Sequence, residues 1–207
     1  MAHGPPAVHR AAAIDRRTPA RPSGTGLSSG VPQPDHRRTG RAPLIDFFDT
    51  TALGAAYLNE PGRQWVRERL FGNGEVVMVS ELADVELPGL LCRAHRAGVI
   101  TDGMLQALLG LYDEDTCSDG PVGVLPVTPT TFTVARQIAL DEPVGSLDAV
   151  HLAAALLLQR RQPQEPVTVV TLDRRQAMAA RRLGFEVLTD PADPVEPAGP
   201  AVPDAPA

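Results

Sequence analysis

The most constraining feature of this sequence is the segment GSLDAVHLAAALLLQRR, which spans Gly145 to Arg161. Between Ser146 and Leu158 it holds one carboxylate and one histidine, and almost nothing else that is polar. A helix with apolar residues on every side must be buried on every side, so we expect a central helix with Asp148 in its first turn. A lone buried carboxylate is costly unless it is paired, hydrogen-bonded or bound to a metal. The sequence therefore requires a partner for this acid.

Short apolar segments alternate with helical segments from residue 44 onward. The candidate strands are 44–48, 75–80, 122–128, 166–171 and 185–188. Continuous apolar strands separated by helices are typical of a parallel sheet that is covered on both faces. We therefore predict an α/β domain with a central parallel β-sheet of four to five strands, flanked by helices on both faces. Pro126 weakens the third strand and favours an edge position for it.

Three positions suggest where helices begin or are interrupted. Asp49 or Thr50 can cap a helix over 51–58. Ser80 ends a strand and is expected to be the N-cap of the next helix. Pro88–Gly89 should kink or break that helix, because proline removes a backbone donor and glycine is a poor helix former.

The two ends of the chain differ in composition from its centre. Residues 1–43 are rich in Arg, Pro and Gly and carry seven arginines against two acids, whereas residues 44–189 carry twelve arginines against nineteen acids. Residues 191–207 are rich in Pro and Ala. We predict a disordered N-terminal extension over 1–43, one folded domain over 44–190 and a disordered tail over 191–207. The extension is interpreted as a solvated tail or an upstream start codon rather than an RNA-contacting arm.

Composition also narrows the chemistry and the compartment. All nineteen basic residues are arginine, so a phosphate-binding P-loop and Schiff-base catalysis, which need lysine, are excluded. A haloacid-dehalogenase-like phosphatase is disfavoured for the same reason and because position 51 lacks a second aspartate. The net charge of −6 argues against holding nucleic acid by charge alone. Two distant cysteines and the absence of a long apolar run predict a cytoplasmic protein without a membrane span.

Acidic residues follow the ends of the predicted strands. Asp49 comes directly after the first strand, and Asp173 follows the fourth. Asp148 opens the buried helix, and Glu86 lies six residues after Ser80. Sites in parallel sheets form beyond the carboxyl ends of the strands, and carboxylates gathered there repel one another until a proton or a cation enters. Oxygen ligands of this kind select Mg²⁺ or Mn²⁺, which promote phosphodiester hydrolysis.

Each acid also has a purely structural interpretation. A helix cap explains Asp49, Asp148 or Asp173 equally well when each is taken alone. The four acids together, set against apolar segments, are less easily explained in that way. Glu81 and Asp84 lie near Glu86 in the sequence and are interpreted as facing solvent.

Four segments, taken in order, resemble the successive motifs of PIN-domain proteins, and most closely those of the VapC-type toxin ribonucleases of toxin–antitoxin pairs. They are FFDTTAL (Phe47–Leu53), VSELADVEL (Val79–Leu87), SLDAVHLAAAL (Ser146–Leu156) and VTLDRRQAMAARRLGFEVL (Val170–Leu188). Each motif is weak alone, but the ordered set is specific and covers about Leu44 to Thr189. Pro88–Gly89 departs from the family's pattern, in which this helix usually continues.

The resemblance implies a PIN-like fold and a Mg²⁺- or Mn²⁺-dependent endoribonuclease with four catalytic carboxylates. Carried over by position, these are Asp49, Glu86, Asp148 and Asp173. We interpret Asp49, Asp148 and Asp173 as metal ligands. Glu86 completes the site and orients or deprotonates the attacking water.

Further residues are expected to support this site. Thr50 and Thr171 match hydroxyl positions of the family, and Ser80 is a further candidate. Arg174 and Arg175 are expected to hold RNA phosphates or to pair with acids of an antitoxin, with a solvated face as the equal alternative.

The resemblance also implies partners. They are an RNA substrate, a second copy of the chain in a homodimer, and a small antitoxin protein whose peptide enters the active-site groove. The alternative function is a non-catalytic PIN-like binding module that retains its acids and works through protein or RNA contacts. The Pro88–Gly89 interruption and the acidic domain favour this alternative.

Two other residues have competing interpretations. His151 lies one turn after Asp148 on the same helix face, so a proton carrier or a metal ligand is conceivable. We favour a packing histidine that hydrogen-bonds a neighbour, because carboxylate sites for Mg²⁺ do not need imidazole. Trp65 is interpreted as a core residue rather than part of a partner interface.

Overall fold

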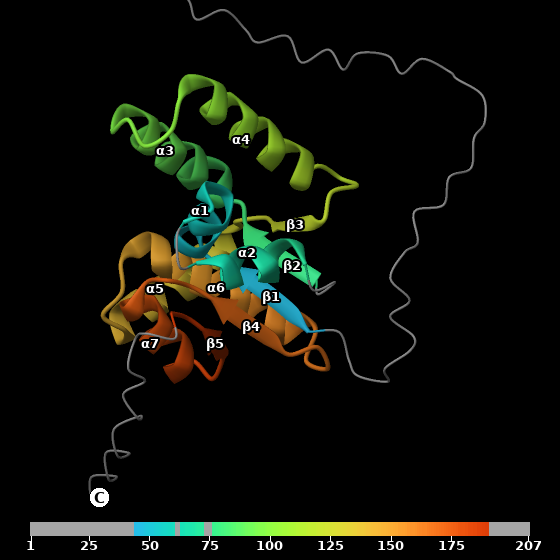
Figure 1. Cartoon of the computed structure of the whole chain (residues 1–207). Helices are drawn as coiled ribbons and strands as arrows, with labels where there is room; N and C mark the ends of the chain where they lie inside the picture. Colours follow the sequence, from blue (N-terminus) through green and yellow to red (C-terminus); the bar gives the residue numbers. More distant parts are fainter. Residues whose placement is uncertain (1–43, 61–62, 73–75, 191–207) are drawn as a thin grey trace, which may run out of the picture. The chain divides into compact units, whose positions relative to one another are not determined.

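A five-stranded parallel sheet forms the centre of the protein, in a computed structural model that describes residues 44–60, 63–72 and 76–190. The strand order is β3-β2-β1-β4-β5 (Figure 1). The strands are β1 (Ile45–Phe48), β2 (Val76–Ser80), β3 (Val122–Leu125), β4 (Val167–Val170) and β5 (Glu186–Leu188). The predicted parallel sheet is confirmed. β3 lies at an edge, as Pro126 indicated, and ends directly before that proline rather than at residue 128.

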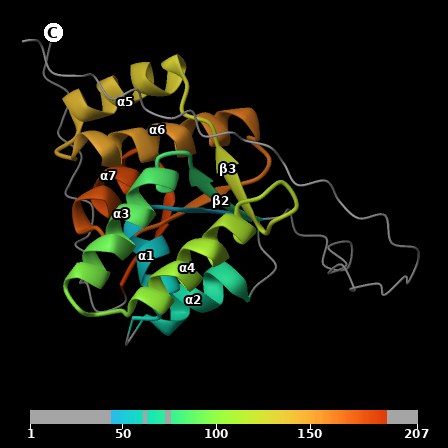
Figure 2. The same cartoon turned by 90° about the horizontal axis from the view of Figure 1, so that it is seen from above.

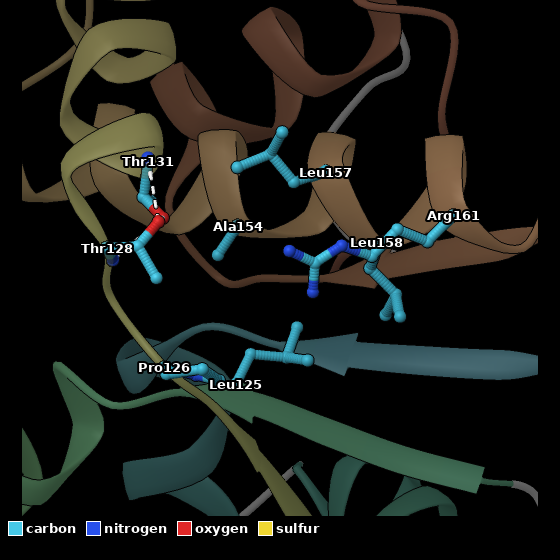
Figure 3. A pocket seen from close by; sticks show the side chains of 8 residues that line it. All are labelled: Leu125, Pro126, Thr128, Thr131, Ala154, Leu157, Leu158 and Arg161. Carbon is cyan, nitrogen blue, oxygen red and sulfur yellow. Dashed lines mark hydrogen bonds between the residues drawn. The ribbon is translucent and has the colours of Figure 1, made fainter.

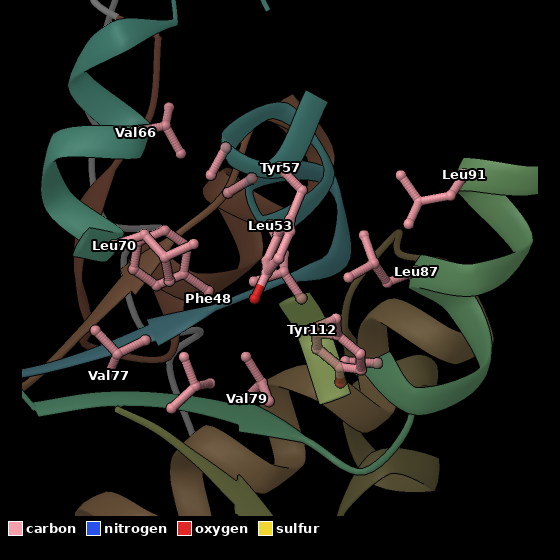
Figure 4. Packing of buried hydrophobic residues seen from close by; sticks show 14 of the residues in the cluster. Phe48, Leu53, Tyr57, Val66, Leu70, Val77, Val79, Leu87, Leu91 and Tyr112 are labelled. Carbon is pink, nitrogen blue, oxygen red and sulfur yellow. The ribbon is translucent and has the colours of Figure 1, made fainter. Parts of the chain in front are cut away.

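Helices cover both faces of the sheet, as predicted (Figure 2). They are α1 (Thr50–Leu58), α2 (Gln64–Phe71), α3 (Ala83–Arg96), α4 (Asp102–Asp115), α5 (Pro129–Asp141), α6 (Ser146–Arg161) and α7 (Arg174–Arg182). Successive side chains of β1 point to opposite faces. Phe48 packs with α1 to α4, whereas Ile45 and Phe47 pack with α5 to α7. Two apolar cores therefore enclose the sheet, and Figure 4 shows the first of them.

The helix α3 is continuous across Pro88–Gly89, so the predicted break was wrong and only a kink stays a prediction. Proline inside a helix costs about 3 kcal/mol. Leu87 and Leu91, on either side of the proline, are both fully buried in the first core, and each contributes about 1.5–3 kcal/mol by burial. Gly54 of α1 lies so close to Leu90 that an added Cβ would stand 2.7 Å from its Cδ1. Close packing against α1 therefore outweighs the local helix-breaking tendency.

Parallel pairing places the carboxyl ends of the strands along one edge. The amide of Asp49 donates to the carbonyl of Val170 at 3.0 Å, and the amide of Glu81 donates to the carbonyl of Leu125 at 2.8 Å. The sheet hydrogen bonds therefore continue just past the strands, into the segments that lead to α1 and α3. The acids that follow β1, β2 and β4 are brought to the same edge.

Some expectations fall on other parts of the sequence. The predicted disorder of 1–43 and 191–207 concerns residues outside the described part of the chain.

Trp65 is half-buried against the first core, in agreement with its interpretation as a core residue. None of the helices in the described ranges has both the length and the apolar character that crossing a membrane requires.

Two tyrosines tie α1, α3 and α4 together on the first core. The Tyr57 hydroxyl donates to Asp115 at 2.5 Å, and the Tyr112 hydroxyl donates to Asp84 at 2.7 Å. The two rings meet edge to face with centroids 5.9 Å apart. Both rings are buried, but Asp115 is buried whereas Asp84 is exposed. The hydroxyl of Tyr57 therefore donates to a carboxylate that is largely shielded from water.

We expect Tyr57→Phe to lower the free energy of unfolding by about 1.5–3 kcal/mol, because it removes a hydrogen bond to a buried carboxylate. Tyr112→Phe is the matched control and should cost about 1 kcal/mol or less, because water can replace the hydroxyl at exposed Asp84. Urea unfolding of both variants measures the difference. Equal losses, or a larger loss for Tyr112→Phe, would contradict this account of the packing.

Candidate active site

Asp49 follows β1 directly and is the N-cap of α1, as predicted. Its side chain is 2% exposed and accepts hydrogen bonds from three directions. The amide of Ala52 donates to Oδ1 at 2.9 Å, the Thr171 hydroxyl donates to Oδ2 at 2.8 Å, and the Thr51 hydroxyl reaches both oxygens at 2.8 and 2.9 Å. Asp49 therefore sits in a cage of hydroxyls and one amide.

Burial dominates the electrostatics of Asp49. Desolvation raises the pKa of its carboxyl to about 6, against the lowering effect of the Ala52 amide and the Thr171 and Thr51 hydroxyls. The hydrogen bonds thus only partly compensate for the loss of water. A nearby positive charge would stabilise the ionised form of this desolvated carboxylate.

Thr171 links Asp49 to Asp173 through its hydroxyl. While its hydroxyl donates to Asp49, its oxygen accepts from the amide of Asp173 at 3.0 Å. Asp173 is the N-cap of α7, and its Oδ1 accepts from the amides of Arg175 and Gln176 at 2.7 and 2.9 Å. Capping thus orients Asp173 after β4, beside the end of the neighbouring strand β1 that Asp49 follows.

Glu86 of α3 is half-buried, and both of its hydrogen bonds within the described residues end on Oε2. The Thr50 hydroxyl donates at 2.6 Å, and Nε2 of His151 lies 2.6 Å away. Burial raises the pKa of Glu86, but the bonds from His151 and Thr50 outweigh it and lower the pKa below its usual value. Glu86 is therefore held as an ionised carboxylate. Thr50 supports this acid rather than Asp49.

Ser80 does not have the capping role that was expected of it. It was predicted to cap the third helix, but α3 begins at Ala83, its N-cap residue Leu82 makes no side-chain cap, and that prediction was wrong. The Ser80 side chain is fully buried, and its Oγ lies 2.9 Å from Nδ1 of His151. Ser80 therefore supports the site indirectly, through the histidine.

Asp148 lies in the first turn of α6, where its Oδ2 accepts from the amide of Gly145 at 3.1 Å. The expected burial on every side is found from Ala149 to Ala155, but the first turn is open, with Leu147 51% exposed and Asp148 half-buried. The predicted full burial of Asp148 was therefore wrong. Helix α6 emerges from the core at this end, so its first acid faces the strand edge.

Burial and neighbouring charges both act on the pKa of Asp148. Desolvation raises its pKa, the Gly145 amide lowers it, and the negative charges of Asp173 and Glu86 raise it further. Acids from α3, α6 and α7 thus share one electrostatic environment. No three His, Cys, Asp or Glu side chains in the described ranges stand close enough to form a ready-made metal site. The carboxylates are neighbours in an open arrangement.

Other acids near Glu86 in the sequence have structural partners. Glu81 is exposed, and its Oε2 accepts from the amide of Val127 at 2.9 Å, which ties the end of β2 to the loop after β3. Asp84 is also exposed and accepts from Tyr112. Arg174 and Arg175 follow Asp173 and are exposed at the start of α7.

The sequence did not identify two contributors to the site. Thr51 donates to both oxygens of Asp49 and accepts from the amide of Leu172 at 2.9 Å. Its spacing, two residues after an N-cap aspartate, is a local signal that could have indicated this bond. Gln176 is buried, and its Oε1 lies 2.9 Å from the Thr171 hydroxyl, a contact that sequence spacing alone does not indicate.

A small pocket lies elsewhere, between the connection that leads into α5 and the helix α6 (Figure 3). Leu125, Leu157 and Leu158 contribute apolar side chains to it, and Arg161 is its only charged lining residue. No carboxylate lines this pocket. The candidate site is therefore the strand edge with its acids.

The raised pKa of Asp49 makes stability depend on pH. An acid whose pKa is about 6 when folded and 3.8 when unfolded favours the folded state below about pH 4, and this contribution is lost as the pH rises through about 6. We expect Asp49→Asn, studied with EDTA, to gain up to about 3 kcal/mol relative to the wild type between about pH 4 and about pH 7. Urea unfolding over this range measures the gain.

Asp113→Asn is the control for the loss of one negative charge, because Asp113 is exposed on α4. Its difference from the wild type should not follow the curve of Asp49→Asn. A constant difference between Asp49→Asn and the wild type across the range would mean that burial does not raise the pKa of Asp49.

Comparison with known proteins identifies the family. The family model of the PIN domain matches residues 47–182. The chain is 32% identical over 143 residues to "Ribonuclease VapC47" from Mycobacterium tuberculosis (strain CDC 1551 / Oshkosh), covering 67% of this chain and 92% of that protein. The residues matched by the PIN-domain model include Asp49, Glu86, Asp148 and Asp173. 

Two solved structures are similar to this chain at lower identity. VapBC2 from Rickettsia felis, bound to a promoter DNA fragment, has a TM-score of 0.49 at 11% identity, covering 70% of this chain and 98% of that one. VapC20 from Mycobacterium tuberculosis, a sarcin–ricin-loop-cleaving toxin, has a TM-score of 0.48 at 18% identity, covering 68% and 95%. On the sequence match, the chain belongs to the PIN-domain family and is of the VapC type.

Proposed function

We propose that this chain is a metal-dependent endoribonuclease and the toxin of a type II toxin–antitoxin pair. The observation that carries the proposal is the shared electrostatic environment of Glu86, Asp148 and Asp173, three acids from three helices at one edge of the sheet. The 32% identity to a protein named a ribonuclease supports the same conclusion. Repelling carboxylates beside a strand edge are the arrangement that a cation and a phosphate can use.

The donor set fits a hard divalent cation. Asp49, Asp148 and Asp173 offer only carboxylate oxygens, which suit Mg²⁺ or Mn²⁺. Burial raises the pKa of both Asp49 and Asp148, and a bound cation would oppose this by favouring their ionised forms. When bound, such a cation would neutralise charge at the phosphate and promote the ionisation of water. Because the carboxylates are in an open arrangement, they would have to close around it.

The other site residues have distinct parts in this hypothesis. Glu86 is ionised and presents a carboxylate to the site, so it is suited to orient or deprotonate the attacking water. Thr51 and Thr171 hold Asp49 in place, and Thr50 holds Glu86. Because water rather than the ribose 2′-hydroxyl attacks, the products would be a 5′-phosphate and a 3′-hydroxyl.

RNA and protein partners follow from the same hypothesis. Arg174 and Arg175 are exposed beside Asp173 and would contact RNA phosphates or the acids of an antitoxin. A VapC-type toxin would form a homodimer and be inhibited by a small antitoxin protein. Because the proposed substrate is RNA, we expect the protein to act in the cytoplasm.

The alternative is a non-catalytic PIN-like binding module. The open arrangement of the acids favours it, since no ready-made metal site exists among the described residues. The continuous helix α3 removes one argument for it, because Pro88–Gly89 does not displace Glu86 from a helix. Activity with metal distinguishes the two functions.

We expect the full chain to cleave RNA with Mg²⁺ or Mn²⁺ and to lose activity in EDTA. Asp148→Asn and Glu86→Gln should each lower kcat at least about 100-fold, because they remove a ligand and the group that acts on water. Cleavage rates on a structured RNA, with mapping of the product ends, measure both effects.

Asp113→Asn removes an exposed acid of α4 that is none of the proposed site residues, and this variant should retain wild-type activity. Equal cleavage by Asp148→Asn and the wild type would mean a contaminating nuclease or a different site. A 2′,3′-cyclic phosphate at the product end would contradict attack by water.

A further inference from the structure

His151 is the buried centre of a hydrogen-bond network that the proposed chemistry leaves unexplained. It lies on α6, one turn after Asp148, and is 2% exposed. Its Nδ1 lies 2.9 Å from the Ser80 hydroxyl of β2, and its Nε2 lies 2.6 Å from Oε2 of Glu86 on α3. The Thr50 hydroxyl of α1 lies 3.3 Å from the same Nε2. These three polar partners of one ring come from three different elements.

The direction of these bonds follows from the partners. Glu86 is an ionised carboxylate that also accepts from Thr50, so Nε2 of His151 must carry the proton and donate it. Ser80 fits either charge state of the ring, because its hydroxyl can donate to a bare Nδ1 or accept from a protonated one. Ser80 therefore fixes the ring so that Nε2–H points at Glu86.

The ring has little freedom to leave this position. It packs edge to face against Phe47 of β1, with ring centroids 6.5 Å apart and an interplanar angle of 68°. The segment of α6 that carries it, Ala149 to Ala155, is buried throughout. Packing on one side and two hydrogen bonds on the other hold the imidazole in one orientation.

The consequence lies in the two oxygens of Glu86. Among the described residues, Thr50 and His151 both bind Oε2, and the other oxygen, Oε1, makes neither bond. Fixing one oxygen of a carboxylate at two points sets the direction of the other. Oε1 is then the oxygen that can reach a water molecule.

We infer that His151 is a positioning residue, which together with Ser80 holds Oε2 of Glu86 so that Oε1 faces the attacking water. This inference rests on the proposed function for the role of Glu86. His151 acts through Glu86 and contacts neither RNA nor metal. It follows that the effect of losing His151 should depend on Glu86 being present.

Steady-state cleavage of RNA by the full chain tests this. We expect His151→Phe, which keeps a ring of similar size but loses both nitrogens, to lower kcat by about 10- to 100-fold with little change in KM. His151→Gln can still donate to Glu86 and should recover part of the loss. Ser80→Ala should lower kcat less than His151→Phe, because packing still restrains the ring.

Two comparisons separate positioning from a general loss of stability. Leu158→Ala removes a buried side chain at the other end of α6 and should leave kcat unchanged after correction for the folded fraction. In a Glu86→Gln background, His151→Phe should cause no further loss, because its target is already gone. Losses that multiply in the double variant, or equal losses in His151→Phe and Leu158→Ala, would overturn the inference.

A measurement without RNA keeps the inference testable if the wild type proves inactive, an outcome that would contradict the proposed function alone. Proton NMR should show a slowly exchanging His151 Nε2–H resonance in the wild type. This resonance should move upfield in Glu86→Gln and stay in place in Asp113→Asn, because a neutral acceptor binds the proton more weakly. A resonance that is absent from the wild type, or that does not move in Glu86→Gln, would overturn the inference.

Discussion

Parallel pairing of the strands is the constraint on which the whole candidate site depends. Strands that all run in one direction must open on the same edge, so the residues that follow β1, β2 and β4 become neighbours. Asp49 and Asp173 reach this edge as N-caps of α1 and α7. Glu86 arrives on α3, and Asp148 arrives on α6 as that helix leaves the core. Each acid is tolerated because a local amide or hydroxyl binds it, and together they remain electrostatically unbalanced.

The sequence predicted most of the architecture because its signals are local and repeated. Alternation of apolar strands with helices indicated the parallel sheet, and Pro126 indicated an edge strand. The errors arose where distant packing overrides a local preference. Helix α3 continues through Pro88 because Leu87 and Leu91 are buried against the first core. Ser80 does not cap α3, and its hydroxyl instead lies beside Nδ1 of His151, 71 residues later in the chain.

The site was predicted unevenly for the same physical reason. Asp49 and Asp173 could be placed because a cap is determined by neighbouring residues, and their roles toward metal stay predictions. The burial of Asp148 was overestimated, because the apolar pattern of α6 does not reveal where the helix emerges from the core. The bond between His151 and Glu86 joins residues 65 apart in sequence, so spacing along α6 could indicate only that His151 shares a face with Asp148.

The central claim is that Asp148 and Asp173 belong to one cation-binding site. Titration of the full chain with Mn²⁺, followed by calorimetry, tests this without RNA. The account predicts that Asp148→Asn and Asp173→Asn each weaken Mn²⁺ binding at least about tenfold, or about 1.4 kcal/mol, while Asp113→Asn binds as the wild type does. Unchanged Mn²⁺ affinity in both Asp148→Asn and Asp173→Asn would contradict it.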